Sequence, residues 1–436
     1  MKSSSLSSLK AAQLLYVSRI TGVPQSGPKL SLVRRIRRAI LQCQVPIPRN
    51  NGRPSGGLCN SEREYASGMN ILSIDVGIRN LGVAHFVVSN VNDGDIVNAR
   101  PILNAWYRVR VSDIDVSSDA NVDLDLDTAS SQGEQLDDAG EGSQPLEMSE
   151  SMSEQRIAEA EDHDNKRTKR KIGKRKGNFS FTLPAYAARA YAVLDSLLEK
   201  HQPTHVLIER QRFRSVGSSA VQEWTLRVGI FEAMLHATLH TYRKRELLRN
   251  QSSQEHQSPA ATPLVFVVEP QRVLRYWRLV TGSTTLGKSE KGIIAYPEKL
   301  SPDHVKRTKV DLVAKWLRDN MEAEAYTAHH EDEYRGQSAD DEEVKIPMRV
   351  SKNREIREMV DAYLDRLTDG IKTVRGKRTR GNGKITSRPE GVDKLDDLAD
   401  CVLQGVAWWE WQVNRYRIKD GVDSSVLREA DAFSSV

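Results

Sequence analysis

The sequence predicts an α/β fold in which a mixed five-stranded sheet carries helices on both faces. Three apolar runs, at 71–75, 81–88 and 102–111, follow one another closely and are typical of strands. The tight, glycine-containing connection between the first two indicates antiparallel pairing. Two further apolar strands, at 205–209 and 264–268, each follow a helical pattern, and this alternation is typical of a sheet whose faces are covered by helices.

The N-terminal segment predicts a small helical unit at 1–43. Apolar residues recur at helical spacing within 6–41, and glycines and prolines interrupt the pattern between 22 and 28. Two short helices around a turn are therefore expected, and the second of them is strongly basic. Residues 44–68 are rich in Pro, Gly, Asn and Ser without apolar periodicity, so they are expected to be a linker before the sheet domain at 69–416.

Two unfolded inserts, at about 112–178 and 321–391, are expected to interrupt the sheet domain. Residues 112–164 are mostly Asp, Glu, Ser and Gly without an aromatic residue, and this composition buries too little apolar surface to offset the entropy of ordering. A basic run follows at 166–176. It is expected to be a DNA-binding arm or a counter-charge for the acidic segment, rather than a nuclear localisation signal.

Helical patterns fill most of the remaining sequence. An amphipathic helix fits 184–200, a long helix fits 218–246, and shorter ones fit 308–320 and 353–368. The last helix begins near Leu395 and is largely apolar. The segments without such a pattern are an ambiguous one at 281–307, a polar one at 321–345, a basic glycine-rich loop at 371–391 and a C-terminal tail at 417–436.

Composition limits the classes of protein to which this chain can belong. The hydrophobic fraction is 38% and the mean hydropathy is −0.55, and both values fit a folded domain that carries unfolded inserts. Cys43, Cys59 and Cys401 are too few and too scattered for a disulfide framework or a zinc site. No apolar stretch approaches the length that crosses a bilayer, so no membrane partner is expected.

Two carboxylates end apolar strands. Asp75 ends the run ILSID and Glu209 ends the run HVLIE, and both runs otherwise have the pattern of buried strands. An ionised carboxylate in such a place is costly unless a cation or hydrogen bonds stabilise it. For Asp75 alone, a strand-end residue that caps a turn is an equally good interpretation, and a strand-end Glu such as Glu209 is ordinarily an exposed residue at an edge. The two together favour a shared site, because ligands bind at the carboxyl ends of strands in open α/β sheets.

A third acidic cluster opens the last helix. Asp396 and Asp397 lie four and three residues before Asp400, so either pair shares a helix face. An acidic first turn is common on exposed helices, since it interacts favourably with the helix dipole. Here the helix continues as CVLQGVAWW, which is largely apolar and favours a buried site. Oxygen-only ligands of this kind suit Mg²⁺ or Mn²⁺, and a pair of such ions can activate water for phosphodiester hydrolysis.

Three segments together resemble one known family. ILSIDVGIRNLGVA, VLIERQRFR and KLDDLADCVLQG are similar to the motifs of the fungal mitochondrial Holliday-junction resolvases, which are cruciform-cutting endonucleases of the RNase H-like superfamily. FVVEPQRV and KRTKVDLVAKWL fit an intermediate strand and a basic helix of that family. The order of the expected strands and helices is also that of an RNase H-like domain. The resemblance leaves out the two inserts.

The resemblance implies metal-ligand and catalytic roles for Asp75, Glu209 and Asp400. A fourth acid is either Asp396 or Asp397, and Asp397 is slightly favoured by its three-residue spacing to Asp400. The stretch TGVPQSGPKLSLVRRI resembles a SAP motif, a helix-extension-helix unit that binds DNA. Basic residues near these motifs are expected to contact phosphates, although a solvated surface role is the commoner outcome for any one of them. They are Lys29, Arg34, Arg35, Arg79, Arg210, Arg212, Arg214, Lys306 and Lys309.

The resemblance further implies an activity and partners. A homodimer would place two active sites on a four-way DNA junction, and symmetric nicks would leave 5′-phosphate and 3′-hydroxyl ends. The expected cofactor is Mg²⁺, with Mn²⁺ as a substitute and two ions per active site, and no small-molecule cofactor is expected. Action in the mitochondrial matrix or nucleoid, in DNA recombination and segregation, is expected. The serine-rich N-terminus, which lacks early acidic residues, is compatible with a presequence.

Three other interpretations fit parts of the sequence. An actin- or hexokinase-like ATPase also opens with an apolar strand that ends in Asp-x-Gly, but Arg79 and Asn80 follow where such proteins have a small hydroxyl residue. A catalytically inactive SAP-containing protein of DNA architecture is disfavoured, because every expected carboxylate is present. A nuclease of the same fold that acts on RNA–DNA hybrids can be excluded only by comparing substrates.

Overall fold

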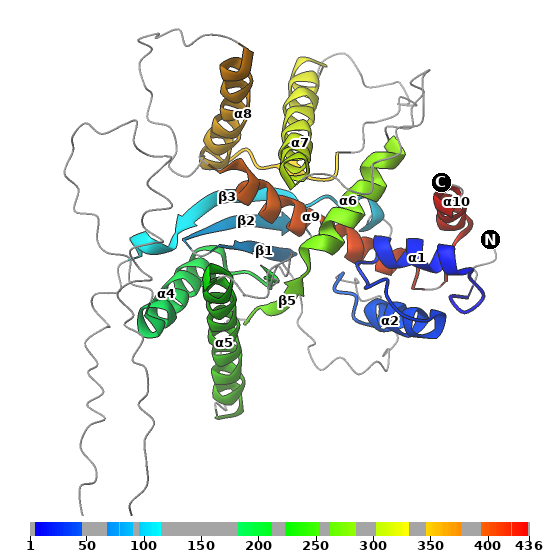
Figure 1. Ribbon diagram of the computed structural model, residues 1–436, viewed down its shortest axis with the longest axis horizontal. Coiled ribbons are helices and arrows are strands. Elements are labelled where there is room, and N and C mark those ends of the chain that lie inside the picture. The colour runs from blue at the N-terminus through cyan, green and yellow to red at the C-terminus, as the bar shows by residue number, and fades with distance from the viewer. Residues whose placement is uncertain are drawn as a thin grey trace, which may run out of the picture. The chain divides into compact units, whose positions relative to one another are not determined.

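A mixed six-stranded sheet forms the centre of the computed structural model (Figure 1). Its strands are β1 (Met69–Val76), β2 (Asn80–Val88), β3 (Ile102–Arg110), β4 (His205–Glu209), β5 (Leu264–Val268) and β6 (Arg349–Val350). In space they follow the order β5-β4-β1-β2-β3-β6. β2 is antiparallel to both β1 and β3, and the other three pairs are parallel.

The structure describes most of the chain outside the long polar segments. The described residues are 5–45, 68–77, 79–89, 96–114, 182–211, 223–252, 262–284, 302–330, 346–375, 394–419 and 421–434. Most of the first predicted insert, the basic run at 166–176 and most of the predicted linker therefore lie outside the described residues, as do Arg212 and Arg214.

The five strands expected from the sequence are confirmed, and with them a mixed α/β sheet. β6 corrects the predicted number of strands, and it lies within 321–391, which was expected to be an unfolded insert. The Arg349 amide donates to the Pro101 carbonyl at 2.9 Å, and the neighbouring Met348 and Val350 are buried. A two-residue strand is too short for an alternating pattern to reveal it.

Helices cover both faces of this sheet (Figure 1). On one side lie α6 (Pro270–Thr284), α7 (Pro302–His330), α8 (Arg354–Arg375) and α9 (Leu395–Arg417), and on the other lie α4 (Leu183–His201) and α5 (Glu223–Ser252). Two single 3₁₀ turns, η1 (Ile96–Asn98) and η2 (Val111–Asp113), flank β3. α8 lies inside 321–391, the second predicted insert, so much of that segment is folded and not an unfolded insert. Tyr363 on α8 is fully buried and contacts Trp106 of β3.

The main core lies between α9 and the sheet. α9 is buried along most of its length, including Trp408, Trp409 and Trp411. The indole N–H of Trp409 donates to the Ala99 carbonyl at 3.1 Å, so the ring can be buried without an unpaired donor. The sheet-side partner is the β2 row that contains Phe86, which is fully buried. α9 is thus fixed against the strands, and its first turn reaches the carboxyl end of β1.

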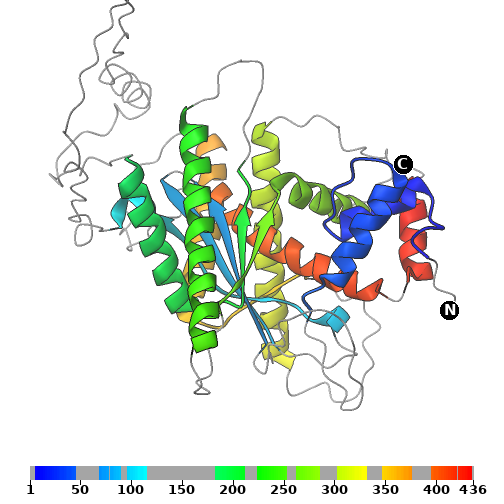
Figure 2. The same cartoon turned by 90° about the horizontal axis from the view of Figure 1, so that it is seen from below.

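The two N-terminal helices are present as expected, at α1 (Ala11–Ile20) and α2 (Lys29–Leu41). They share a small core of their own with α10 (Ser424–Ser434), which lies within the predicted tail (Figure 2). Gln13 of α1 donates to Asp431 of α10 at 2.9 Å, and Tyr16 donates to Glu429. We call this three-helix group the N-terminal unit. The described helices include none with the length and hydropathy of a bilayer-spanning segment.

Candidate active site

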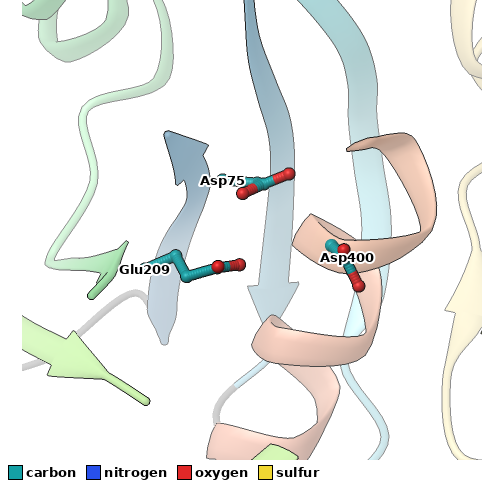
Figure 3. Close-up of side chains that lie close together, drawn as sticks. All are labelled: Asp75, Glu209 and Asp400. Carbon is teal, nitrogen blue, oxygen red and sulfur yellow. The ribbon is translucent and has the colours of Figure 1, made fainter. Parts of the chain in front are cut away.

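Three of the predicted acids lie together at the carboxyl ends of two neighbouring strands (Figure 3). Asp75 is near the end of β1 and Glu209 ends β4, and these strands are parallel neighbours in the sheet. Asp400 lies near both and comes from α9. One carboxylate oxygen from each residue lies within 4.8 Å of the others. Convergence from three separate parts of the chain is the arrangement that the sequence motifs predicted.

Two glycines allow α9 to come this close to the sheet. Gly82 is the β2 register partner of Asp75, and a Cβ there would lie 2.4 Å from the backbone oxygen of Asp397. Further along α9, a Cβ on Gly405 would lie 2.3 Å from the ring of Phe86. Real Cβ atoms do not make contacts this short, so larger residues at either position would push the helix away from the acids.

Gln404 holds the same helix onto β1 by hydrogen bonds. Its Nε2 donates to the Ser73 hydroxyl at 3.1 Å and to the Ile74 carbonyl at 3.3 Å. Gln404 and Ser73 are both buried. The contact lies one helical turn from Asp400 and two residues from Asp75, so it fixes the separation of these two acids. Gln404 was not predicted from the sequence, although an amide within the apolar run CVLQGVAWW, one turn after Asp400, is a signal for it.

Asp397 and Asp396 lie beside the three acids but have different neighbours. Oδ2 of Asp397 lies 3.6 Å from Nε of Arg108, whereas Oδ2 of Asp396 lies 3.1 Å from Nζ of Lys306. The negative charge of Asp397 helps to raise the pKa of Asp75, and the negative charge of Asp396 helps to raise the pKa of Asp400. Asp397 stays the predicted fourth acid, and its support is that its backbone lies against Gly82, the register partner of Asp75.

Arg108 is a further residue that was not predicted from the sequence. The row Asp75, Gly82 and Arg108 crosses three adjacent strands in register, and register partners have side chains on the same face. The Arg108 side chain is only 7% exposed. The available signal was its position two residues after the apolar Trp106 on β3, since residues two apart in a strand share a face.

Burial and mutual repulsion raise the pKa values of the central acids. Burial is the largest cause for Asp75, followed by the charges of Glu209, Asp400 and Asp397, and its pKa lies well above the ordinary value. Burial, then the charge of Asp400, raises the pKa of Glu209 to about 7. For Asp400, burial raises the pKa although Lys309 opposes it. A positive charge close to these acids would lower their pKa values and stabilise the ionised carboxylates.

Lys309 of α7 supplies one such charge. Its Nζ lies 2.6 Å from Oδ1 of Asp400. Burial lowers the pKa of Lys309, but the charges of Asp400, Glu209 and Asp75 raise it more, so the net shift is upward and the side chain is an ammonium. The Lys309 ammonium and the Arg108 guanidinium carry two positive charges, which do not balance the four carboxylates of Asp75, Glu209, Asp397 and Asp400. The donors that remain are carboxylate oxygens, the ligands that Mg²⁺ and Mn²⁺ prefer.

The other predicted basic residues lie in three places. At the ends of the strands, Arg79 is exposed just before β2 and Arg210 directly follows β4. The Arg210 side chain is 57% exposed and lies 3.4 Å from Glu269. Lys306 is 60% exposed on α7, beside the acids. Lys29, Arg34 and Arg35 lie on α2 in the N-terminal unit, and not at the acidic site.

Stability of the metal-free protein is expected to fall as the pH rises from about 4.5 to about 7. The pKa of Glu209 is about 7 in the folded protein against an ordinary 4.5, so the folded state holds more protons than the unfolded state in this window. The loss is about 3 kcal/mol from this group. Chemical unfolding in EDTA at pH 5 and pH 7.5 measures it. Glu209→Gln, which cannot titrate, should show a smaller pH dependence, and equal dependence in both proteins would contradict the assignment.

Comparison with known proteins found a matching family and similar proteins, two of which are described next. The family model described as mitochondrial resolvase Ydc2 / RNA splicing MRS1 matches residues 71–418, a span that contains all four acids. The mitochondrial cruciform cutting endonuclease 1 of Schizosaccharomyces pombe is 31% identical over 108 residues. That match covers 25% of this chain and 38% of the relative, so it spans well under half of the relative's length. The crystal structure of the yeast mitochondrial Holliday junction resolvase Ydc2 is 19% identical, covering 94% of this chain and 97% of that one, with a TM-score of 0.42.

Proposed function

Because this chain belongs to the mitochondrial resolvase Ydc2 / RNA splicing MRS1 family, we propose that it is an endonuclease that resolves four-way DNA junctions by metal-dependent phosphodiester hydrolysis. The observation that carries the proposal is the convergence of the Asp75, Glu209 and Asp400 carboxylates within 4.8 Å of one another. Buried carboxylates that repel one another lower the stability of the fold, and a cation offsets this cost. A cluster of this kind is expected where function requires it.

The chain's own residues divide the work of the reaction. Asp75, Glu209 and Asp400, with Asp397 beside them, are the groups that would hold Mg²⁺, for which Mn²⁺ can substitute, at two ions per site. Bound ions of this kind lower the pKa of water and stabilise the oxygen that leaves the phosphate. Lys306, which pairs with Asp396, and Arg210, which follows Glu209 in sequence, are both largely exposed and would contact the phosphates next to the one that is cut.

The names of the family and of the fission-yeast relative support the substrate and the compartment. The family is described as a mitochondrial resolvase, and the relative is a mitochondrial cruciform cutting endonuclease. For this chain we infer a homodimer that nicks two strands of a junction, leaves 5′-phosphate ends, and acts in the mitochondrial matrix or nucleoid in DNA recombination and segregation. The N-terminal unit, a SAP-like group by sequence, would hold the DNA outside the acidic site through Lys29, Arg34 and Arg35.

A comparison of substrates tests the proposal. The full chain with Mg²⁺ is expected to cut a synthetic four-way junction at symmetric positions, and to cut a linear duplex of the same arm sequence at least about tenfold more slowly. Gel analysis of end-labelled strands measures both rates, and a phosphatase-sensitive 5′ end identifies the product. Equal cleavage of the junction and the duplex would contradict junction selectivity. Preferred cleavage of an RNA–DNA hybrid would assign the chain to the other nuclease class of this fold.

A second candidate function is RNA binding without hydrolysis, since the family description also names RNA splicing. The raised pKa values of Asp75 and Glu209 weigh against it, because a binding role gives no reason to keep costly buried acids. The same panel of substrates separates the two functions. Tight binding of structured RNA, with no cleavage of any substrate in Mg²⁺ or Mn²⁺, would favour the splicing role.

A further inference from the structure

A pocket lies outside the acidic site, where the N-terminal unit meets α6. It has a volume of about 250 Å³. Arg19 and the loop at 22–26 line it from the N-terminal unit, and Glu269, Arg272 and Arg275 line it from the beginning of α6. Three arginines and a single glutamate make this surface basic. Guanidinium groups in this number suit a ligand with several anionic oxygens.

The positive charge of this pocket is compensated only in part. Nη2 of Arg272 lies 2.8 Å from Oε1 of Glu269, and Nη1 of Arg210 lies 3.4 Å from the same oxygen. The one carboxylate in the pocket is thus already shared by two arginines. Within the described residues, Arg19 and Arg275 form no ion pair at all.

Arg19 is held in place with an unfilled hydrogen-bond donor. Its guanidinium carbon lies 4.5 Å from the centre of the Phe433 ring of α10, a cation–π contact that fixes its position. Its Nε is buried and has no hydrogen-bond partner among the described atoms. Burial, and then the charge of Arg275, lowers the pKa of Arg19. A guanidinium in this state gains free energy when an anion reaches it.

The loop that forms one wall is already ordered by its contacts. Gly22 has φ +67°, and a Cβ there would lie 2.3 Å from the ring of Trp411, so a glycine is required. The Gly22 carbonyl accepts a hydrogen bond from Arg272 at 3.3 Å, and the Ser26 carbonyl accepts one from Arg35 of α2. A ligand therefore meets a formed site, and little ordering entropy opposes its binding.

We propose that this pocket binds a phosphodiester group of a nucleic-acid backbone, with Arg19 and Arg275 as the contacting side chains. The assignment rests on the proposed function, which supplies DNA as the substrate. Arg210 connects the two places, because it follows Glu209 directly in sequence and pairs with Glu269 at the pocket. A strand that leaves the acidic site over Arg210 reaches the pocket next, so one junction arm contacts both the sheet and the N-terminal unit.

The salt dependence of binding tests the pocket. Asp75→Asn serves as the parent protein, so that a bound four-way junction is not cut. Adding Arg275→Ala should weaken junction binding roughly eightfold at 0.1 M salt and reduce the slope of log affinity against log salt by about 0.9, the value for one lost phosphate contact. Arg19→Lys, which keeps the charge but loses the planar fork, should give a smaller loss. Arg349→Ala, at an exposed arginine on the opposite edge of the sheet, is the matched control and should change neither quantity.

Three outcomes would overturn the proposal, and they differ. If the parent binds the junction and Arg275→Ala matches Arg349→Ala in affinity and slope, the pocket inference fails and the proposed function stands. If inorganic phosphate raises the unfolding temperature of the unsubstituted protein but not of Arg275→Ala, while the junction slope is unchanged, the pocket takes a free phosphate and not a DNA strand. If the parent binds neither junction nor duplex, the inference and the proposed function fail together.

Discussion

Asp75→Asn is expected to lower the rate of junction cleavage on the order of 10³-fold or more, with little change in junction binding. The substitution keeps the size of the side chain and removes one carboxylate from the three that lie within 4.8 Å. Loss of several kcal/mol of metal-assisted transition-state stabilisation corresponds to a rate change of this order. The basic residues that hold the phosphates are unchanged. Single-turnover cleavage and a gel-shift titration measure the two effects separately.

The stability of the same variant distinguishes loss of the site from loss of the fold. Asp75 has a raised pKa because of its burial and its acidic neighbours, so its charge destabilises the metal-free protein at neutral pH. In EDTA, Asp75→Asn should therefore unfold at the same temperature as the unsubstituted protein or at a higher one. Saturating Mg²⁺, at 100 times its Kd, should stabilise the unsubstituted protein by about 2.7 kcal/mol and the variant far less.

Asp361→Asn, at an exposed position of α8, is the matched control and should leave the cleavage rate and the Mg²⁺ response unchanged. Full cleavage by Asp75→Asn would show that the Asp75 carboxylate is not needed for the reaction. A variant that has lost activity but keeps the full Mg²⁺ stabilisation would mean that the cation binds elsewhere.

The positions of Asp75 and Glu209 were predictable because each ends an apolar run. Such runs become central strands, and the order of elements makes these two strands parallel neighbours. Asp400 was predictable for a similar reason, since an acid one turn inside an apolar helix has no solvent to face. These inferences use local patterns and the order of elements, and both are written in the sequence.

The contacts made across long distances in sequence could not be predicted in this way. Helical spacing favoured Asp397 over Asp396 only slightly, and the contacts that separate them in the structure are those of Asp397 with Gly82 and of Asp396 with Lys306. α10 buries its apolar face against α1, about 400 residues away in the chain. β6 gains its place from two hydrogen-bonded neighbours on β3. In each case the partner is fixed by packing of the whole domain, which local periodicity does not contain.

Gly405→Val is expected to destabilise the protein by about 3 kcal/mol and to weaken the acidic site, although it adds no polar group. A Cβ at this position would lie 2.3 Å from one atom of the Phe86 ring and 2.9 Å from the next. Phe86 is fully buried and cannot move aside, so α9 must shift away from β2. Asp400 lies on the same helix little more than one turn away and would move with it. Chemical unfolding with and without Mg²⁺ measures both losses.

Close packing against Phe86, and not the loss of a helical glycine as such, is the expected cause of this effect. Gly229 lies in α5, and a Cβ there would meet no atom within 4 Å, so Gly229→Ala should stabilise the protein by up to about 1 kcal/mol through helix propensity alone. Combining Gly405→Val with Phe86→Leu should recover part of the lost stability, with a coupling on the order of 1 kcal/mol, because the smaller side chain makes room for the new methyl groups. If Gly405→Val unfolds like the unsubstituted protein and responds fully to Mg²⁺, the contact of Gly405 with Phe86 does not set the distance of α9 from the sheet. It then does not determine the position of Asp400 beside Asp75 either.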